Sequence, residues 1–230
     1  MWYDDLQKKI NKKTKVVIYT QMNGRVGKID LIKKICKKNN LTLIEDAAHA
    51  IGSYNKKKHV GNSGLAGSFS FSMPKLITMG QGGAIITNST KLANKLRLYK
   101  NFGRKKSGED RHDYMGYNFK ITDMQSMLAL SQLKSVKPRM KKKKEIYTKY
   151  KSKLKNNPKI KFFEVRKNET PWSVDIYLKD VNKLKKKLEE KNIFTRYVIH
   201  HLTHKKFIRI LKIYQYQIFI VKEACGCLLA

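Results

Sequence analysis

Two groups of polar side chains in the first third of the chain have the types and positions needed for chemistry. Glu45 and Asp46 directly follow the apolar run at residues 41–44 (LTLI). Ligands of parallel sheets gather beyond the carboxyl ends of the strands, so Asp46 stands where a functional carboxylate is expected. Serine and phenylalanine alternate over residues 68–72 (SFSFS), which predicts a short strand with hydroxyl groups on one face. This face, which includes Ser70, suits the binding of an oxyanion.

A strand, a helix and a second strand must position Asp46. Residues 15–20 (KVVIYT) form a β-branched run, and residues 29–39 carry apolar side chains at helical spacing. With the run at residues 41–44, this order is typical of a βαβ unit, in which the strands are parallel and buried. The first half of the chain is therefore predicted to have an α/β fold.

The rest of the chain carries further element signals and no internal repeat. The expected elements are, in chain order, a strand at 84–87, a helix at 91–101, a polar loop at 102–117, a helix that Thr122 caps and that continues or restarts after Pro138, strands at 160–165 and 172–178, a helix at 181–191 and a strand at 194–199. The last part has an α+β arrangement. We place the change of domain within residues 136–150.

The composition excludes an acidic or neutral protein. The 230 residues include 51 Lys and Arg against 17 Asp and Glu, a formal net charge of +34. Such an excess suits nucleic acid or an anionic membrane, yet here it is mostly Lys scattered along the whole chain, whereas phosphate-binding proteins more often use Arg. We interpret the charge as compositional bias of an A+T-rich genome, with nucleic-acid binding as the minority interpretation. The densest run, residues 137–144 (KPRMKKKK), is expected at the solvated start of a helix.

The sequence indicates neither a membrane segment nor a metal or disulfide framework. There is no run of about 18 apolar residues, and the first five residues lack the basic and apolar regions of a signal peptide. The cytoplasm is therefore the expected compartment, with no membrane partner. Cys36, Cys225 and Cys227 are odd in number and lack metal-binding spacing, so we interpret them as ordinary thiols.

Four short motifs together resemble one enzyme family. They are EDAAHA at residues 45–50, SFSF at 68–71, Lys75 followed by GQGG at 80–83, and GYNFKITD at 116–123. This set resembles the DegT/DnrJ/EryC1/StrS family over residues 11–229. The family consists of nucleotide-sugar aminotransferases that use pyridoxal phosphate and have the aspartate aminotransferase fold, fold type I. Within it, the motifs look most like the perosamine synthase branch, which aminates a 4-keto-6-deoxy sugar on a nucleoside diphosphate.

The resemblance implies a role for each residue of the motifs. Lys75 is the lysine that holds the cofactor as a Schiff base and then moves a proton between the substrate carbon and the cofactor. Asp46 pairs with the protonated pyridine nitrogen, and Ser70 binds the phosphate. Asn118 reaches the phosphate of the neighbouring subunit, which implies a homodimer with the site at its interface. His49, where many members carry Gln or Glu, contacts the phenolic oxygen of the cofactor.

Other positions bear on the reaction and its substrate. Related sugar dehydratases carry histidine in place of the Schiff-base lysine, so Lys75 favours transamination over dehydration. Arg196 lies in a segment similar to the family's TR segment, and its implied contact with substrate is a weak one because the prolines expected after it are replaced. The clustered His200, His201 and His204 are interpreted as incidental and not as a metal site.

The resemblance also implies part of a fold type I architecture. Residues 1–135 correspond to the C-terminal part of the large pyridoxal-phosphate-binding domain, a remnant of its mixed sheet. Residues 136–230 correspond to a truncated small α+β domain. The family's preceding segment carries a phosphate-binding glycine-threonine turn and an aromatic that stacks on the cofactor, and neither has a counterpart here, so the chain is expected to be a fragment.

The implied function is transfer of an amino group, with glutamate as donor, to a keto sugar on a nucleoside diphosphate, for cell-surface polysaccharide or glycan biosynthesis. Three alternatives stay open from the sequence. They are a transaminase for a cyclitol, an inactive fragment of a sugar aminotransferase, and a basic nucleic-acid-binding protein on a degenerate scaffold.

Overall fold

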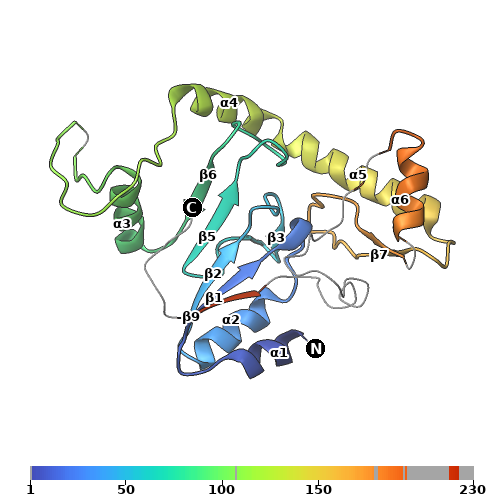
Figure 1. Cartoon of the computed structure of the whole chain (residues 1–230), viewed down its shortest axis with the longest axis horizontal. Helices are drawn as coiled ribbons and strands as arrows, with labels where there is room; N and C mark the ends of the chain where they lie inside the picture. Colours follow the sequence, from blue (N-terminus) through green and yellow to red (C-terminus); the bar gives the residue numbers. More distant parts are fainter. Residues whose placement is uncertain (1, 107, 179–180, 194, 196–217, 223–230) are drawn as a thin grey trace.

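A five-stranded mixed sheet forms the centre of the molecule (Figure 1). The computed structural model describes residues 2–106, 108–178, 181–193, 195 and 218–222. The strand order is β6-β5-β2-β1-β9. Helices α1 (Trp2–Lys9) and α2 (Ile29–Lys38) lie beside β1 and β9, and the helices α4 (Asp123–Lys134) and α5 (Val136–Leu154) run past the other end of the strands (Figure 1).

The predicted βαβ unit is confirmed. Strand β1 (Thr14–Thr20) pairs in parallel with β2 (Thr42–Asp46), in a register from Val16 opposite Thr42 to Thr20 opposite Asp46. Helix α2 connects the two strands. Its apolar residues recur on one face, which packs against the sheet. The core that results contains, among others, Val17, Tyr19, Ile29, Ile32, Ile35, Cys36 and Leu43.

Three more strands complete the sheet and make it mixed. Strand β5 (Ala66–Ser70) is parallel to β2, whereas β6 (Gly83–Ile86) is antiparallel to β5 and β9 (Ile218–Lys222) is antiparallel to β1. Because β1, β2 and β5 run in the same direction, their carboxyl ends meet at one edge. Thr20, Asp46 and Ser70 are the last residues of these three strands.

The remaining elements follow the expected order, with differences of length. They are a 3-10 turn at Met22–Gly24, β3 (Tyr54–Asn55), β4 (Lys58–His59), α3 (Thr90–Lys100), α4, α5, β7 (Lys161–Phe162), β8 (Ile176–Tyr177) and α6 (Val181–Glu189). Neither α1 nor the β3–β4 hairpin was predicted. The expected strands at 160–165 and 172–178 are only two residues long, and they pair with each other as a separate two-stranded sheet. Glu169 and Thr170, between them, bond to loops of the first domain instead of extending that sheet. The expected strand at 194–199 lies outside the described residues except for Thr195.

The predicted cap of α4 is present, whereas the restart comes two residues before Pro138 and not after it. Thr122 caps α4 in a capping box, since its hydroxyl accepts from Gln125 N at 3.3 Å while Gln125 Oε1 accepts from Thr122 N at 3.0 Å. The helix ends at Lys134 and restarts at Val136, so Pro138 lies in the first turn of α5, where its missing N–H costs nothing. The division into domains at residues 135 and 136 coincides with this break and stays a prediction.

Residues 166–175, which belong to the predicted second domain, pack against the first domain. Glu169 Oε1 accepts from Val26 N at 2.8 Å, and Thr170 N donates to Ser53 Oγ at 2.9 Å. Glu169 and Thr170 are both buried. The segment 166–175 therefore packs against the loops that follow β1 and β2, beside the edge where the strands end.

Cys36 behaves as the ordinary thiol that the sequence predicted. It is buried in the core, and this burial raises the pKa of its thiol to about 11, which keeps it protonated. Cys225, Cys227 and the clustered histidines lie outside the described residues. Within the ranges that the structure describes, no helix is both long enough and apolar enough to cross a bilayer.

Candidate active site

The two carboxylates at the end of β2 differ in burial: Glu45 is fully buried and Asp46 is half-buried. Successive side chains of a strand point to opposite faces. Glu45 is fully buried, and its carboxylate accepts hydrogen bonds from the Gln21 side chain (2.6 Å) and from three backbone N–H groups at residues 61–64 (2.5–3.0 Å). Asp46 is half-buried at the strand end, where it accepts from Thr20 Oγ1 at 3.4 Å and from Ala48 N at 3.1 Å. The charge of Asp46 is close enough to act on Lys75, so the carboxylate lies near the amine of the loop that follows β5.

Hydroxyl groups line the end of β5, as the alternation of serine and phenylalanine predicted. Phe69 is buried on one face, while Ser68 and Ser70 are half-buried on the other. Ser70 Oγ lies 3.1 Å from Ser72 Oγ and accepts from Ser72 N at 3.4 Å. One of the two hydroxyls donates to the other, so the second keeps its proton available to an added anion.

Lys75 lies in a closed loop between β5 and β6. The loop is fastened by Phe71 N donating to Gly82 O (2.8 Å) and by Met79 N donating to Phe71 O (2.9 Å), while Lys75 N donates to Ser72 O (3.0 Å). Gly82 has a φ of +151°, a backbone conformation that favours glycine. Burial lowers the pKa of Lys75, and the negative charge of Asp46 opposes that shift.

Trp172 connects Lys75 with His49. The indole N–H donates to Pro74 O at 2.9 Å, and Lys75 Nζ lies 5.3 Å from the centre of the indole ring. The His49 ring stacks on the same indole, with centroids 4.2 Å apart and planes 8° apart. The sequence analysis missed this residue, because Trp172 appeared only as the start of a strand.

His49 is a neutral imidazole at physiological pH. Burial, first of all, and then the charge of Lys75 lower its pKa to about 4, against smaller opposing effects of Asp46 and Asp175. Asn23 N donates a long hydrogen bond of 3.5 Å to His49 Nδ1. The proton of the neutral ring then resides on Nε2, which has no hydrogen-bond partner within the described part of the chain.

The basic run at residues 137–144 is not the solvated helix start that the sequence predicted. It forms the first half of α5, and part of it faces inward because residues one helical turn apart share a face. Three of its cations donate to backbone carbonyls: Arg139 Nη1 to Leu76 O (3.1 Å), Lys143 Nζ to Trp172 O (2.8 Å) and Lys144 Nζ to Lys167 O (3.0 Å). Burial lowers the pKa of Lys143. Part of the run therefore contacts the Lys75 loop, through Arg139, and the backbone of Trp172, through Lys143.

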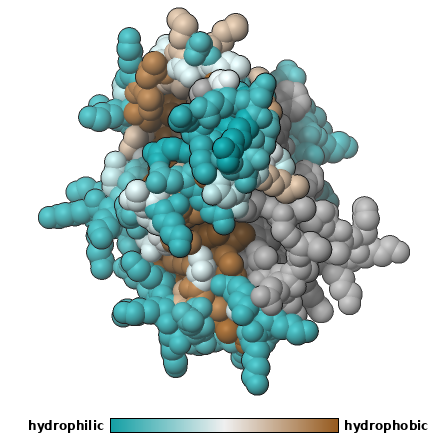
Figure 2. Space-filling model, turned by 90° about the vertical axis from the view of Figure 1, so that its left-hand side faces the viewer, coloured by the Kyte–Doolittle hydropathy of each residue, from teal (hydrophilic) through white to brown (hydrophobic). Residues whose placement is uncertain are grey.

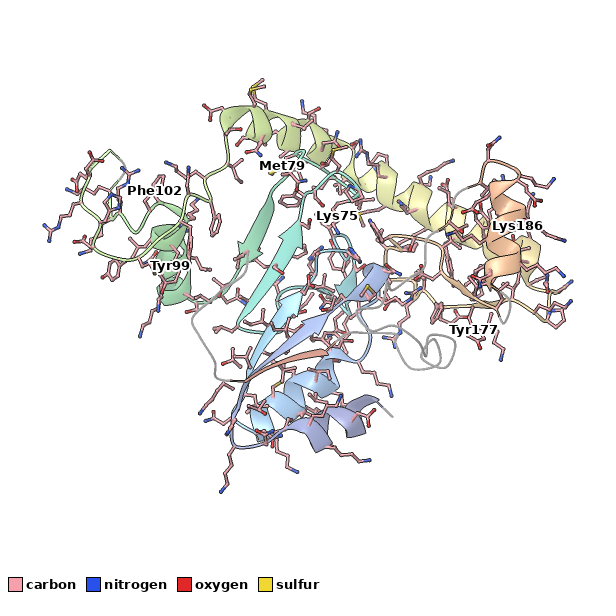
Figure 3. All side chains as sticks on the ribbon, viewed as in Figure 1. Lys75, Met79, Tyr99, Phe102, Tyr177 and Lys186 are labelled. Atoms are coloured by element: carbon pink, nitrogen blue, oxygen red, sulfur yellow. The ribbon has the colours of Figure 1, made fainter. Side chains whose placement is uncertain are left out.

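The other predicted site residues lie apart from this group. Asn118 is exposed and pairs with Asn101 in an isolated bridge at the end of α3. Figure 3 shows this region, marked by Tyr99 and Phe102, on the far side of the sheet from Lys75. A role for Asn118 at the site of another subunit stays a prediction. Arg196 lies outside the described residues.

The side chains that meet at the strand edge fit pyridoxal phosphate. The cofactor's aldehyde needs an amine, its pyridine nitrogen a carboxylate, and its phosphate hydrogen-bond donors. Lys75, Asp46 and the hydroxyl pair of Ser70 and Ser72 supply these three chemistries at the ends of neighbouring strands. No cluster of three or more His, Cys, Asp or Glu suited to a metal ion is found among the residues that the structure describes.

Comparisons with known proteins agree with this chemistry. Residues 2–217 match the profile of the DegT/DnrJ/EryC1/StrS aminotransferase family. The UDP-4-amino-4,6-dideoxy-N-acetyl-beta-L-altrosamine transaminase of Helicobacter pylori is 34% identical over 221 residues, which cover 93% of this chain and 56% of that protein. The GDP-perosamine synthase of Vibrio cholerae is 36% identical over 155 residues, 67% of this chain and 42% of that protein. The chain thus spans about half the length of the curated relatives it matches.

Solved structures show the same fold. PseC of Helicobacter pylori, an aminotransferase involved in the biosynthesis of pseudaminic acid, matches with a TM-score of 0.76 and 31% identity, over 82% of this chain and 53% of that one. The aminotransferase TlmJ from Streptoalloteichus hindustanus has a TM-score of 0.79 at 22% identity, over 87% of this chain and 57% of that one. At that identity, the second likeness speaks for the fold alone.

Proposed function

The chain belongs to the DegT/DnrJ/EryC1/StrS aminotransferase family, and on this basis we propose that it is part of a pyridoxal-phosphate-dependent sugar aminotransferase. The observation that carries the proposal is the meeting of Asp46, Ser70 and Lys75 at the carboxyl ends of β2 and β5. The expected reaction moves an amino group from glutamate to a keto group of a sugar linked to a nucleoside diphosphate. The expected compartment is the cytoplasm.

Each residue of the site has a definite task in this reaction. When bound, pyridoxal phosphate carries the amino group and accepts electrons from the substrate carbon. Lys75 holds the cofactor covalently, Asp46 accepts the pyridinium N–H, and Ser70 donates to the phosphate. His49 donates from Nε2 to the phenolic oxygen, which a neutral imidazole with Nδ1 as acceptor can do.

The lowered pKa of Lys75 supports its second task, which is to move a proton. A lysine transfers protons well when a useful fraction of its amine is neutral near the working pH. Burial of Lys75 favours that neutral form, while the charge of Asp46 limits the shift.

The names of two relatives support the substrate class. One is described as a transaminase of a UDP-linked amino sugar and the other as a synthase of GDP-perosamine. We therefore propose a nucleotide-linked keto sugar as substrate for the present site.

We further propose that a second copy of the chain covers the apolar surface of α4 and residues 114–121. Met115, Met124 and Met127 are 84%, 83% and 72% exposed, respectively, and α4 has no buried residue. Near the top of Figure 2, which is the end where α4 lies in Figure 1, brown apolar side chains are exposed among the hydrophilic ones. An exposed apolar surface of this kind is typical of an interface. Asn118 belongs to this surface, so dimerisation would bring it toward the partner's site.

The cofactor proposal is tested by trapping pyridoxal phosphate on the protein. The purified chain is incubated with pyridoxal phosphate, reduced with borohydride, digested and mapped by mass spectrometry. We expect the adduct at Lys75, its loss in Lys75→Ala, and its retention in Lys56→Ala, which removes an exposed lysine. Labelling spread over the surface lysines with no preference for Lys75 would overturn the proposal.

A further inference from the structure

Trp172 occupies the junction between the site and the C-terminal half of the chain. Its side chain reaches two residues of the site: the indole N–H donates to Pro74 O at 2.9 Å, directly before Lys75, and the ring stacks on His49 at 4.2 Å. A stacked ring excludes water from the face that it covers, while a hydrogen bond to the preceding carbonyl orients the backbone of Lys75. These are two separate contacts that can be removed one at a time.

The backbone of Trp172 is anchored at both of its polar atoms. Its N–H donates to Asn23 O at 3.2 Å, and its carbonyl accepts from Lys143 Nζ at 2.8 Å. One turn earlier on α5, Arg139 Nη1 donates to Leu76 O at 3.1 Å. Helix α5 thus contacts both the Lys75 loop and the residue that holds it, through two cations on the same face.

We propose that Trp172 is a positioning residue, which sets Lys75 and His49 relative to each other, and that Lys143 of α5 holds Trp172 in place. Trp172 acts through its neighbours. Its indole N–H orients the turn that carries Lys75, and its ring shields one face of His49 from water and fixes the plane of the imidazole. The role of Lys75 in this statement rests on the proposed function, whereas the contacts of Trp172 do not.

Two substitutions of Trp172 separate the stacking from the hydrogen bond. Trp172→Phe keeps an aromatic ring against His49 and removes the donor to Pro74 O, whereas Trp172→Ala removes both. His49 is titrated by NMR, and amide hydrogen exchange is measured at Lys75, whose N–H is bonded to Ser72 O. The unsubstituted chain is expected to show a His49 pKa of about 4.

The expected results differ between the two variants. In Trp172→Phe the His49 pKa stays near 4, while the Lys75 amide exchanges about fivefold faster, as expected from the loss of one neutral hydrogen bond nearby. In Trp172→Ala the amide again exchanges faster and the His49 pKa rises toward the ordinary value near 6.5. A change of global stability alone would not separate these two readouts. The proposal is overturned if Trp172→Ala leaves both unchanged.

The proposed role of Lys143 in holding Trp172 is tested with Lys144 as a matched control. Both are lysines on α5 that donate to a carbonyl, but Lys143 donates to Trp172 O and Lys144 donates to Lys167 O. Lys143→Met and Lys144→Met therefore remove the same charge from the same helix. We expect only Lys143→Met to speed exchange at the Lys75 amide. Equal effects of the two substitutions would exclude an anchoring role for Lys143.

Borohydride trapping of pyridoxal phosphate connects the inference with the proposed function. If Trp172 positions Lys75, Trp172→Phe lowers the yield of adduct at Lys75 several-fold without altering the low yields at surface lysines. If the unsubstituted chain forms no adduct at Lys75, the proposed function fails, and the titration of His49 with the exchange data still decides the role of Trp172. Unchanged Lys75 labelling in Trp172→Phe, with labelling present in the unsubstituted chain, would refute positioning through the indole N–H.

Discussion

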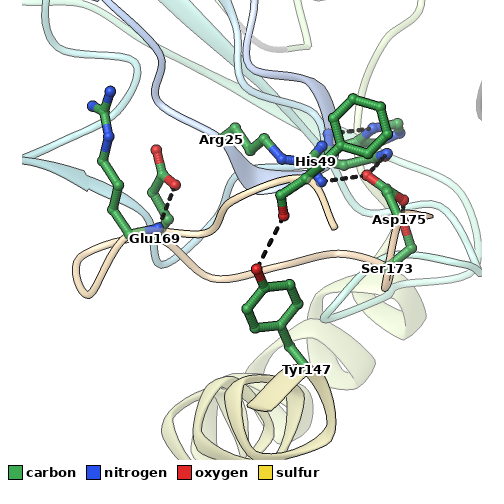
Figure 4. Close-up of polar contacts among 9 residues, drawn as sticks. Arg25, His49, Tyr147, Glu169, Ser173 and Asp175 are labelled. Carbon is green, nitrogen blue, oxygen red and sulfur yellow. Dashed lines mark hydrogen bonds and ion pairs between the residues drawn. The ribbon is translucent and has the colours of Figure 1, made fainter. Parts of the chain in front are cut away.

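Arg25 and Asp175 form a buried ion pair between the first loop of the sheet and the C-terminal half of the chain (Figure 4). Arg25 Nη2 lies 2.6 Å from Asp175 Oδ2, and the two side chains are 5% and 4% exposed. The carboxylate also accepts from Asn23 Nδ2 and Ser173 Oγ, both at 2.6 Å, so its oxygens are satisfied. Arg25 Nη2 is close to the carboxylate but outside good hydrogen-bond geometry, so charge dominates this contact.

Asp175→Asn is expected to lower the free energy of unfolding by roughly 3 kcal/mol, because it leaves the Arg25 charge buried without a counter-charge. Urea unfolding followed by circular dichroism measures this loss. Glu164→Gln is the control, since it breaks the exposed pair with Lys151 and is expected to cost less than about 1 kcal/mol. Equal losses in the two variants would mean that the buried pair contributes nothing beyond a surface pair.

Gly24→Ala is expected to destabilise the protein far more than Gly80→Ala. Both glycines have nearly the same positive φ, +83° and +81°, which costs an alanine about 1 kcal/mol. A Cβ at Gly24 would lie 1.9 Å from Thr170 O, whereas nothing lies within 4 Å of one at Gly80. The difference between the two unfolding free energies therefore measures how closely the segment 166–175 packs on this loop, and a difference near zero would contradict that packing.

Substitutions of the neighbours Glu45 and Asp46 are expected to affect different properties, protein stability for Glu45 and cofactor binding for Asp46. Glu45→Gln replaces an acceptor of buried N–H groups and should cost roughly 2 kcal/mol of stability, the amount typical of hydrogen bonds to a charged group. Asp46→Asn should leave stability nearly unchanged and weaken binding of pyridoxal phosphate about tenfold, which is about 1.4 kcal/mol. Unfolding curves and absorbance titrations with the cofactor test the two halves, and similar behaviour of both variants would contradict the division of roles.

The stability of the folded chain is expected to fall as the pH drops from about 6.5 to 4, in part because of His49. The folded protein holds the pKa of His49 at about 4, below the ordinary 6.5, so the unfolded chain binds more protons between these values. The contribution of His49 to the free energy of unfolding is therefore complete above pH 6.5 and is lost as the pH falls to 4. His49→Gln should show a smaller decrease in urea midpoint over this range, and an identical decrease would show that His49 is not buried in the neutral form.

Self-association is expected to depend on the apolar surface of α4. Sedimentation equilibrium should show a dimer for the unsubstituted chain, and Met124→Lys with Met127→Lys should weaken it at least about tenfold, because two charges would be desolvated at the interface. Tyr150→Lys, also an exposed apolar residue but on α5, serves as the control. A monomer at all concentrations, or equal weakening by the control, would exclude this surface as the interface.

The βαβ unit and the cap of α4 could be predicted because their signals are local. The β-branched run before α2, its helical stripe and Thr122 each act through neighbours within a few residues. The strands at 160–165 and 172–178 were predicted too long because their apolar residues do not reveal what they contact. In the folded chain, Glu169 and Asp175 bind the first loop of the sheet instead of a neighbouring strand.

From local patterns alone, the sequence predicted the candidate site residues: Asp46 at a strand end, the serines of the following strand and Lys75 in its motif. It also determined the parallel order of the first strands, since pattern and connection length act along the chain. The folded chain was needed to show that Glu45 is structural, that Trp172 contacts both Lys75 and His49, and that Lys143 points inward from a lysine-rich run. Local patterns miss these contacts because they join residues distant in sequence. Burial distinguishes them, and a lysine or tryptophan is locally the same whether it packs against the site or faces water.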